Sequence, residues 1–301
     1  MATDTMTSRA APEDLGHRSP RLARRMFLDR LLRWLLPLSF LLVLLPLFDL
    51  LYYVGVRALP TFTVATVTTN PVGFGGGLLA PIVGTLVLIS VATGFAALVG
   101  IAAGMYTAEF APRPIARTAR LAGNLLAGIP AIVVGYFGYF LFVLATGNFS
   151  TLAGAITLGI FMVPYVYRVC DLALARVPHE QREAALAMGA RRGQYLLRIA
   201  LPIAFPSILT GIFLAMAIGL GETAPLVLTA GWSNTPVTSL LGPTSYLTGI
   251  VYQNYQFPTT LGNLVTLAFQ AALLLVVIVL ALNIVVQFIA ERYRKRLRGL
   301  F

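Results

Sequence analysis

Long apolar runs alternate with short polar stretches along most of this chain. A helix that crosses a membrane needs roughly 20 mainly apolar residues, because it must pass through about 30 Å of hydrocarbon. Six runs are long enough, at residues 31–56, 80–107, 121–146, 150–169, 206–230 and 264–289. The pattern therefore predicts an all-α integral membrane protein with six transmembrane helices.

The stretches between the runs predict how these helices are connected. Residues 59–79 contain Asn70-Pro71 and a run of glycines, so we expect an exposed turn without a helix. The link at residues 146–150 is so short that the third and fourth spans should form an antiparallel helical hairpin.

The last connection, residues 232–260, has no charged side chain and is called the neutral segment below. Amphipathic aromatic rings favour the boundary between membrane and water. We therefore expect this boundary to hold Trp232, Tyr246, Tyr252 and Tyr255. The neutral segment is either a docking surface for an extracytoplasmic binding protein or an interfacial loop that caps the bundle.

The composition agrees with a membrane protein and argues against several chemistries. Of the 301 residues, 58% are hydrophobic and 11% are charged, whereas a soluble domain carries about 25% charged residues. The net charge of +11 comes from basic residues beside apolar runs, so we expect contact with the lipid bilayer and not with nucleic acid. The single cysteine, Cys170, cannot form an internal disulfide and has no partner for a metal site.

The basic residues also predict the orientation in the membrane. Six spans put both termini on one side, and every Lys and Arg except Arg57 lies in segments that share this side. The positive-inside rule identifies this side as the cytoplasm. We expect a disordered cytoplasmic tail at residues 1–28, one transmembrane domain at 29–290 and a basic cytoplasmic tail at 291–301.

A charged stretch at residues 178–202 interrupts the apolar pattern. Pro178 can open a helix, and Gly189 can end that helix in a left-handed conformation. A second helix should begin at Arg191 and end before Pro202. Its apolar residues fall on one buried stripe, formed by Tyr195, Leu196, Ile199 and Ala200.

The same stretch contains Glu183-Ala184-Ala185, Gly189 and Ile199-Ala200-Leu201-Pro202 at the spacing of a known motif. It resembles the EAA loop of ATP-binding-cassette importer permeases. The resemblance implies that residues 170–202, the coupling loop, dock onto a separate ATPase through Arg182, Glu183, Ala184, Ala185, Gly189 and Arg191. The small alanines would allow close approach, and Glu183 would offer a charge. The alternative is an amphipathic interfacial helix whose arginines lie near lipid headgroups.

An acidic residue lies within the fifth predicted span. Counted from Pro206, Glu222 lies roughly 24 Å into the helix at 1.5 Å per residue. A carboxylate at that depth is costly, so it should face the bundle interior or a water-filled cavity. We take Glu222 and Thr223 as candidates for the substrate pathway. The alternative is a glutamate that hydrogen-bonds a neighbouring helix.

Arg168, at the inner end of the fourth predicted span, is a third pathway candidate. Its guanidinium either contacts an anionic substrate or extends to the cytoplasmic interface.

Further stretches narrow the resemblance. They are Gly75-Gly76-Gly77-Leu78, Ile82-Val83-Gly84-Thr85, Tyr106-Thr107-Ala108-Glu109-Phe110-Ala111-Pro112, Gly128-Ile129-Pro130-Ala131-Ile132-Val133-Val134-Gly135 and Gly221-Glu222-Thr223-Ala224-Pro225-Leu226. Together they resemble the PstA family, permease subunits of bacterial phosphate importers. Related sequences often carry an arginine four residues before the glutamate of the last stretch, where this chain has Ile218.

The resemblance implies a MetI-like fold and a multi-pass protein of the bacterial plasma (inner) membrane. It implies three kinds of partner, a PstC-type permease in a heterodimer, a PstB-type ATPase dimer and an extracytoplasmic phosphate-binding protein. ATP would be bound by the ATPase, so no cofactor and no catalytic residue are expected here. Three alternatives stay open. They are a permease for sulfate, molybdate or phosphonate, a stand-alone secondary carrier or channel, and a membrane scaffold protein.

Overall fold

The computed structural model describes residues 20–72, 75–256 and 264–298 and divides into two units, Met1–Tyr53 and Val54–Phe301. The first unit holds most of α1 (Pro20–Ala58), a 39-residue helix whose apolar side chains are largely exposed. This helix begins inside the predicted tail of residues 1–28, and residues 1–19 lie outside the described part. An exposed apolar helix of this length fits a lipid-facing span.

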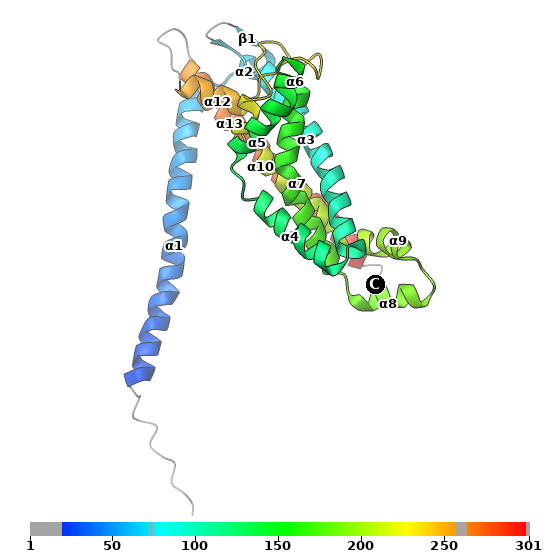
Figure 1. Ribbon diagram of the computed structural model, residues 1–301. Helices are drawn as coiled ribbons and strands as arrows, with labels where there is room; N and C mark the ends of the chain where they lie inside the picture. The colour runs from blue at the N-terminus through cyan, green and yellow to red at the C-terminus, as the bar shows by residue number, and fades with distance from the viewer. Residues whose placement is uncertain (1–19, 73–74, 257–263, 299–301) are drawn as a thin grey trace, which may run out of the picture. The chain divides into compact units, whose positions relative to one another are not determined.

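The core of the second unit is the pair of helices α3 (Leu79–Met105) and α7 (Thr151–Ala175), which lie side by side (Figure 1). Small residues recur at every fourth position on the buried face of α3, namely Ala92, Ala96, Gly100 and Gly104. A Cβ on Gly100 would lie 2.8 Å from the Val166 side chain, and one on Gly104 would lie 2.7 Å from Cys170. Such small residues let helix backbones approach closely in membranes.

The third predicted span is broken, so a continuous helix over residues 121–146 is wrong. Helix α4 (Arg113–Leu126) and the helical segment Ala131–Thr146 meet at an angle of 98°. That segment consists of α5 (Ala131–Gly138), a π-turn (Tyr139–Val143) and α6 (Leu144–Thr146). Pro130 lacks a backbone N–H and disfavours helical geometry at the residue before it, which explains the break.

Among the described residues, five helices are long and apolar enough to cross a membrane, or six if the bent pair is one span. The fifth predicted span differs at both ends. Helix α9 (Arg192–Tyr195) passes through a π-turn (Leu196–Ala200) into α10 (Leu201–Gly221), so Pro202 does not end the helix. Pro202 follows the π-turn as the second residue of α10, so its missing N–H falls at the junction of the two helices and not in the middle of α10. Helix α10 ends at Gly221 instead of near residue 230.

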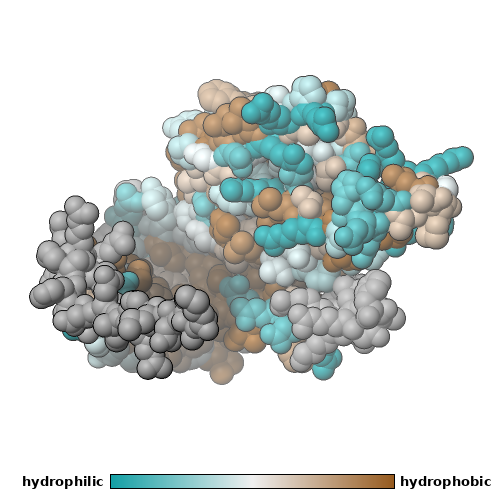
Figure 2. Space-filling model, turned by 90° about the horizontal axis from the view of Figure 1, so that it is seen from below, coloured by the Kyte–Doolittle hydropathy of each residue, from teal (hydrophilic) through white to brown (hydrophobic). Residues whose placement is uncertain are grey.

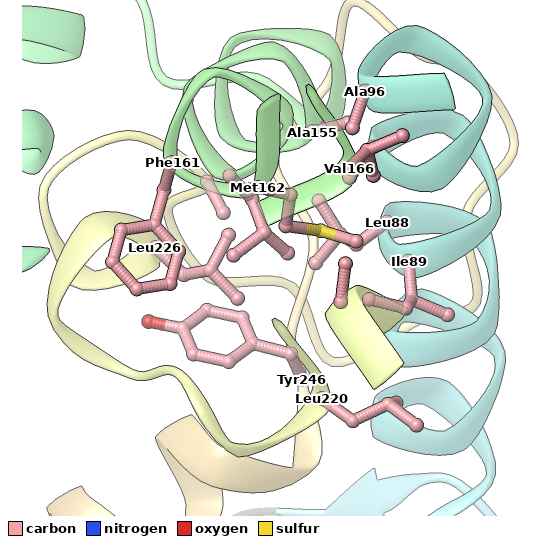
Figure 3. Close-up of a cluster of buried hydrophobic side chains, with 14 residues drawn as sticks. Leu88, Ile89, Ala96, Ala155, Phe161, Met162, Val166, Leu220, Leu226 and Tyr246 are labelled. Carbon is pink, nitrogen blue, oxygen red and sulfur yellow. The ribbon is translucent and has the colours of Figure 1, made fainter. Parts of the chain in front are cut away.

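Part of the neutral segment packs into the protein. Helix α12 (Leu247–Gln256) buries Leu247 and Ile250, and Tyr246 joins the main hydrophobic cluster. In Figure 3, Tyr246 lies beside Leu226 and Phe161, together with Leu88 and Met162. The predicted boundary position of Tyr246 is therefore wrong, whereas Tyr252 and Tyr255 are exposed. Residues 257–260 lie outside the described part.

Residues 59–79 also contain more structure than expected, so a helix-free turn is wrong. They form a 3₁₀ turn (Leu59–Thr61), helix α2 (Val64–Thr68) and an antiparallel pair of short strands, β1 (Pro71–Val72) and β2 (Gly75–Gly76). The Thr63 N–H donates to Thr66 Oγ1 at 3.1 Å, which satisfies a backbone donor at the start of α2.

The helical hairpin at residues 146–150 is confirmed. Gly147 adopts a left-handed conformation with φ of 71°, and the Ser150 hydroxyl accepts a hydrogen bond from the N–H of Ala153 at 3.0 Å. The final helix, α13 (Leu264–Arg298), continues past residue 290 into the predicted basic tail.

The two ends of the second unit differ in character. Helices α8 (His179–Ala187) and α9 lie at one end, whereas α2, β1 and α12 lie at the other (Figure 1). Viewed from the end with α8 and α9, the surface is rich in hydrophilic side chains (Figure 2).

Candidate functional site

Of the two short helices that the sequence of the coupling loop predicts, the first is present as α8, whereas the second, α9, continues into α10. Helix α8 follows Pro178, and Gly189 adopts a left-handed conformation with φ of 85°. The Gly189 N–H donates to the carbonyl of Leu186 at 2.9 Å, and the Ala190 N–H donates to that of Ala185 at 3.0 Å. These bonds end α8 and turn the chain toward α9, as left-handed glycine caps do.

Helix α8 has an inner and an outer face. Ala185 is 1% exposed and packs with Leu174, Tyr195 and Leu196 in a hydrophobic cluster. The outer face consists of exposed side chains, namely Glu183, Ala184, Ala187 and Met188. Of the two alanines, only Ala184 can therefore contact a partner. Ala185 instead packs α8 against other residues of its own chain.

Two further residues that the motif assigned to coupling, Glu183 and Arg191, are exposed. Glu183 lies 3.2 Å from His179 Nδ1, a contact that is ionic only when the histidine is protonated, and both side chains are exposed. Arg191 is exposed before α9, and its backbone N–H donates to Gln194 Oε1 at 2.8 Å.

Arg182 points inward and forms an ion pair that the sequence did not suggest. Its Nη2 lies 2.9 Å from Glu109 Oε1, and its Nε lies 3.2 Å from both carboxylate oxygens. Glu109 belongs to the π-turn Tyr106–Phe110 that ends α3, and its side chain is only 7% exposed. These hydrogen bonds raise the pKa of Arg182 above its ordinary value. Arg182 is therefore charged, and its guanidinium donates to Glu109 of its own chain.

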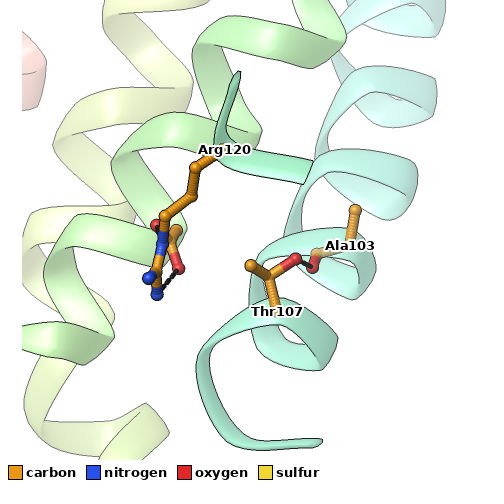
Figure 4. A network of polar contacts seen from close by, with 4 residues as sticks. Ala103, Thr107 and Arg120 are labelled. Carbon is orange, nitrogen blue, oxygen red and sulfur yellow. Dashed lines mark hydrogen bonds and ion pairs between the residues drawn. The ribbon is translucent and has the colours of Figure 1, made fainter. Parts of the chain in front are cut away.

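A second ion pair ties α4 to α7. Arg120 Nε lies 2.8 Å from Asp171 Oδ2, and Arg120 Nη2 lies 3.0 Å from Asp171 Oδ1. Figure 4 shows Arg120 reaching from its own helix to this contact. The Asp171 side chain is 8% exposed and the Arg120 side chain 49%. The available signal was the carboxylate of Asp171, since an ionisable group beside a predicted span normally has a partner.

Replacement of Arg120 by methionine should destabilise the protein, because it leaves the Asp171 carboxylate buried without a partner. We expect a loss of about 1–3 kcal/mol, below the roughly 3–5 kcal/mol of a fully buried pair, since Arg120 is half-exposed. A thiol-reactive dye that detects the buried Cys170 on heating would measure the unfolding temperature.

Two further variants test the cause. Combining Arg120→Met with Asp171→Leu should restore part of the lost stability, because no charge then stays buried. Arg33→Gln removes an exposed ion pair with Asp29 and should cost less than about 1 kcal/mol. An unfolding temperature of Arg120→Met equal to that of Arg33→Gln would contradict the prediction.

Glu222 does not lie inside a helix, which corrects its predicted position. It follows the last residue of α10 with extended backbone (φ −78°, ψ 131°), and α11 (Ala224–Val227) begins after Thr223. Thr248 Oγ1 donates to the Glu222 backbone carbonyl at 3.1 Å. Within the described part of the chain, the carboxylate makes no hydrogen bond or ion pair. Glu222 and Thr223 are both half-buried at this break.

The broken span packs against this break. A Cβ on Gly135 of α5 would lie 3.0 Å from Pro225 Cα and 3.1 Å from the carbonyl oxygen of Ala224. Helices α5 and α11 are thus in close backbone contact beside Glu222.

Arg168 is not brought to Glu222. It is exposed on α7 and forms no ion pair within the described residues. Gly219, near Glu222, lies against Met162, and Met162 is roughly 9 Å along the helix axis from Arg168. An open groove of about 640 Å³ runs between α7 and α10, with Arg176, Ser207 and Thr210 among its lining residues. Neither Arg168 nor Glu222 lines it.

Comparison with known proteins identifies relatives for most of this architecture. A family model for a binding-protein-dependent transport system inner membrane component matches residues 100–299. The chain is 39% identical over 257 residues to a protein named phosphate transport system permease protein PstA 2 from Mycobacterium bovis, covering 84% of this chain and 85% of that protein. It is 32% identical over 273 residues to a probable PstA permease from Methanocaldococcus jannaschii, covering 88% and 94%.

The fold resembles that of a solved permease. An inward-facing structure of the MetNI methionine ABC transporter matches with a TM-score of 0.60 at 20% identity, over 72% of this chain and 95% of that one. The MetI-like fold is thereby confirmed, and the family and the spans identify a multi-pass inner membrane protein. Importers of this family in general combine permeases with an ATPase and a substrate-binding protein. The chain belongs to the family of binding-protein-dependent transport system inner membrane components and, within it, to the PstA permeases.

Proposed function

We propose that this chain is one of two permease subunits of an ATP-driven importer of inorganic phosphate. The observation that carries the proposal is the 39% identity, over 84% of the chain, to a phosphate transport permease. The described residues supply a surface for an ATPase on α8 and an acidic group at a helix break.

The proposed complex contains a PstC-type permease, a PstB-type ATPase dimer and an extracytoplasmic phosphate-binding protein. The outer face of α8 fits the ATPase, because Glu183 offers a charge and Ala184 allows close approach. The ATPase binds and hydrolyses ATP, and this chain has no catalytic role. Both termini and the coupling loop face the cytoplasm. The ion pairs of Glu109 and Asp171 support this orientation, since they join the basic 109–120 and 170–202 segments at one end of the second unit.

Transport follows from movement of α8. Closure of the ATPase dimer on ATP displaces the coupling loop and opens the pathway toward the binding protein, and hydrolysis resets it. Phosphate at neutral pH keeps a P–OH group that can donate a hydrogen bond to the Glu222 carboxylate. Sulfate at that pH has no such proton.

The deciding experiment measures the ATPase activity of the full complex in lipid vesicles with different loaded binding proteins. Phosphate-loaded binding protein should stimulate hydrolysis and uptake. Stimulation by sulfate-, molybdate- or phosphonate-loaded protein alone would refute the choice of substrate. Uptake that continues without any ATPase would instead indicate a stand-alone carrier or channel.

Glu222→Gln should lower phosphate uptake while leaving assembly of the complex unchanged. The carboxylate has no partner in the described residues, so its loss costs little stability. Glutamine keeps an acceptor oxygen, so the loss is the difference between a charge-assisted and a neutral hydrogen bond, roughly 1–1.5 kcal/mol, which corresponds to an uptake rate about 5- to 13-fold lower. Asp29→Asn, which removes an exposed carboxylate from α1, is the control. Wild-type uptake by Glu222→Gln would show that this side chain is structural.

A further inference from the structure

Helix α8 depends on few contacts for its position. It is nine residues long and is joined to α7 and α9 by the short segments at residues 176–178 and 188–191. Ala185 is buried, Gln181, Arg182 and Leu186 are half-buried, and of these four Arg182 forms an ion pair with the rest of the protein. Ala185 supplies apolar packing, which does not resist sliding strongly. The directional attachment is therefore the ion pair between Arg182 and Glu109.

The geometry of this ion pair makes it a rigid joint. Two guanidinium nitrogens of Arg182 make three contacts of 2.9–3.2 Å with the Glu109 carboxylate, and the side chains are 29% and 7% exposed. Planar Arg–carboxylate pairs of this kind restrict orientation as well as distance. Removal of Arg182 leaves the Glu109 carboxylate, which is 7% exposed, without a compensating charge.

Glu109 lies where a movement of α8 can be passed on to the membrane-spanning helices. It belongs to the π-turn between α3 and α4, and such turns are frequent at functional positions. Helix α4 is held to α7 by the Arg120–Asp171 pair, and its far end leads through the 98° bend into α5. Helix α5 contacts α11 beside Glu222 through Gly135.

We propose that Glu109 is a positioning residue for energy coupling. It holds Arg182 so that a displacement of α8 moves the α3–α4 junction and, through it, the broken span. The inference rests on the proposed function in one respect, namely that an ATPase displaces α8. It assigns Arg182 to the transmission of movement inside this chain rather than to contact with the ATPase.

The test uses the complete complex in lipid vesicles with Glu109→Gln, Arg182→Gln and the double variant. Glutamine keeps the approximate shape of each side chain and removes its charge. We expect the number of ATP molecules hydrolysed per phosphate imported to rise at least about fivefold in each single variant, within the usual range of coupling energies. The double variant should be no worse than either single one, because both remove the same contact.

A second measurement reports the position of α8 without any substrate. Met188 is 82% exposed and the single native cysteine is buried, so a nitroxide on Met188→Cys labels α8 selectively. The label should become more mobile in Glu109→Gln and return toward the wild-type spectrum in Glu109→Asp. Arg33→Gln, which removes an exposed ion pair of α1, is the control and should change neither measurement.

A wild-type hydrolysis-to-uptake ratio in Glu109→Gln would overturn the proposal. Multiplying effects of the two single substitutions would also overturn it, because the residues would then act separately. If Glu109→Gln does not assemble, the double variant replaces it, because it buries no unpaired charge. A wild-type hydrolysis-to-uptake ratio in the double variant, or a ratio well above that of Arg182→Gln, would then overturn the proposal. A wild-type complex without phosphate-stimulated hydrolysis would refute the proposed function instead, and label mobility would still test the joint.

Discussion

Replacement of Gly189 by proline is expected to abolish ATP-coupled phosphate uptake without reducing the amount of protein in the membrane. Gly189 has a φ of 85° and donates its N–H to Leu186. Proline restricts φ to about −65° and has no N–H to donate. The turn from α8 to α9 therefore cannot form, and the outer face of α8 is displaced. Uptake by reconstituted vesicles, normalised to inserted protein, measures the effect.

Alanine substitutions separate backbone conformation from steric contact at this turn. Neither Gly189 nor Gly193 has a neighbouring atom within 4 Å of an added Cβ, but only Gly189 has a positive φ. Gly189→Ala should therefore cost roughly 1–2 kcal/mol, whereas Gly193→Ala, within α9, should be neutral or stabilising by up to about 1 kcal/mol. Normal uptake by Gly189→Pro would refute the role of the bend in coupling.

Replacement of Gly84 by leucine is expected to prevent stable folding of the neutral segment against α3. A Cβ at Gly84 would overlap the backbone carbonyl of Ser245 and lie 2.5 Å from Thr244 Oγ1. Both neighbours are buried, so they cannot move aside. The substitution also displaces the bond from the Leu247 N–H to Thr85 Oγ1, which measures 2.9 Å. We expect a loss of about 3 kcal/mol or more, at the upper end of overpacking effects.

Gly94→Leu is the matched control, because it lies on the same helix, is exposed and has no neighbour within 4 Å. The unfolding temperature reported by dye labelling of Cys170 should fall in Gly84→Leu and stay near the wild-type value in Gly94→Leu. Equal unfolding temperatures would show that residues 244–247 do not need their close contact with α3.

Local features of the coupling loop were predictable because short-range rules govern them. The helix after Pro178, the left-handed Gly189 and the buried Tyr195 and Leu196 all follow from residues within one or two turns. The resemblance of the loop to the EAA motif also selected the correct family. The direction in which each side chain of α8 faces depends on what lies beneath the helix, so the opposite roles of Ala184 and Ala185 were not predictable.

The candidate pathway was predicted less well. Hydropathy placed Glu222 within a continuous span because residues 206–230 are mainly apolar on both sides of it. The structure ends α10 at Gly221, and packing of α5 against Ala224 and Pro225 lies beside the break. Whether Arg168 contacts the substrate or extends to the cytoplasmic interface stays open, because no described contact joins it to Glu222.

The sequence by itself determined the membrane environment, most of the spans, the family and the helix and glycine turn at residues 178–189, because apolar run length, charge placement and short motifs are local properties. Tertiary structure alone decided the inward folding of the neutral segment and the partners of the buried charges. The Glu109–Arg182 and Arg120–Asp171 pairs join residues 73 and 51 positions apart. These pairs form only when the helices pack. A charge that packing buries is costly without a partner, and the fold decides which opposite charge lies near it.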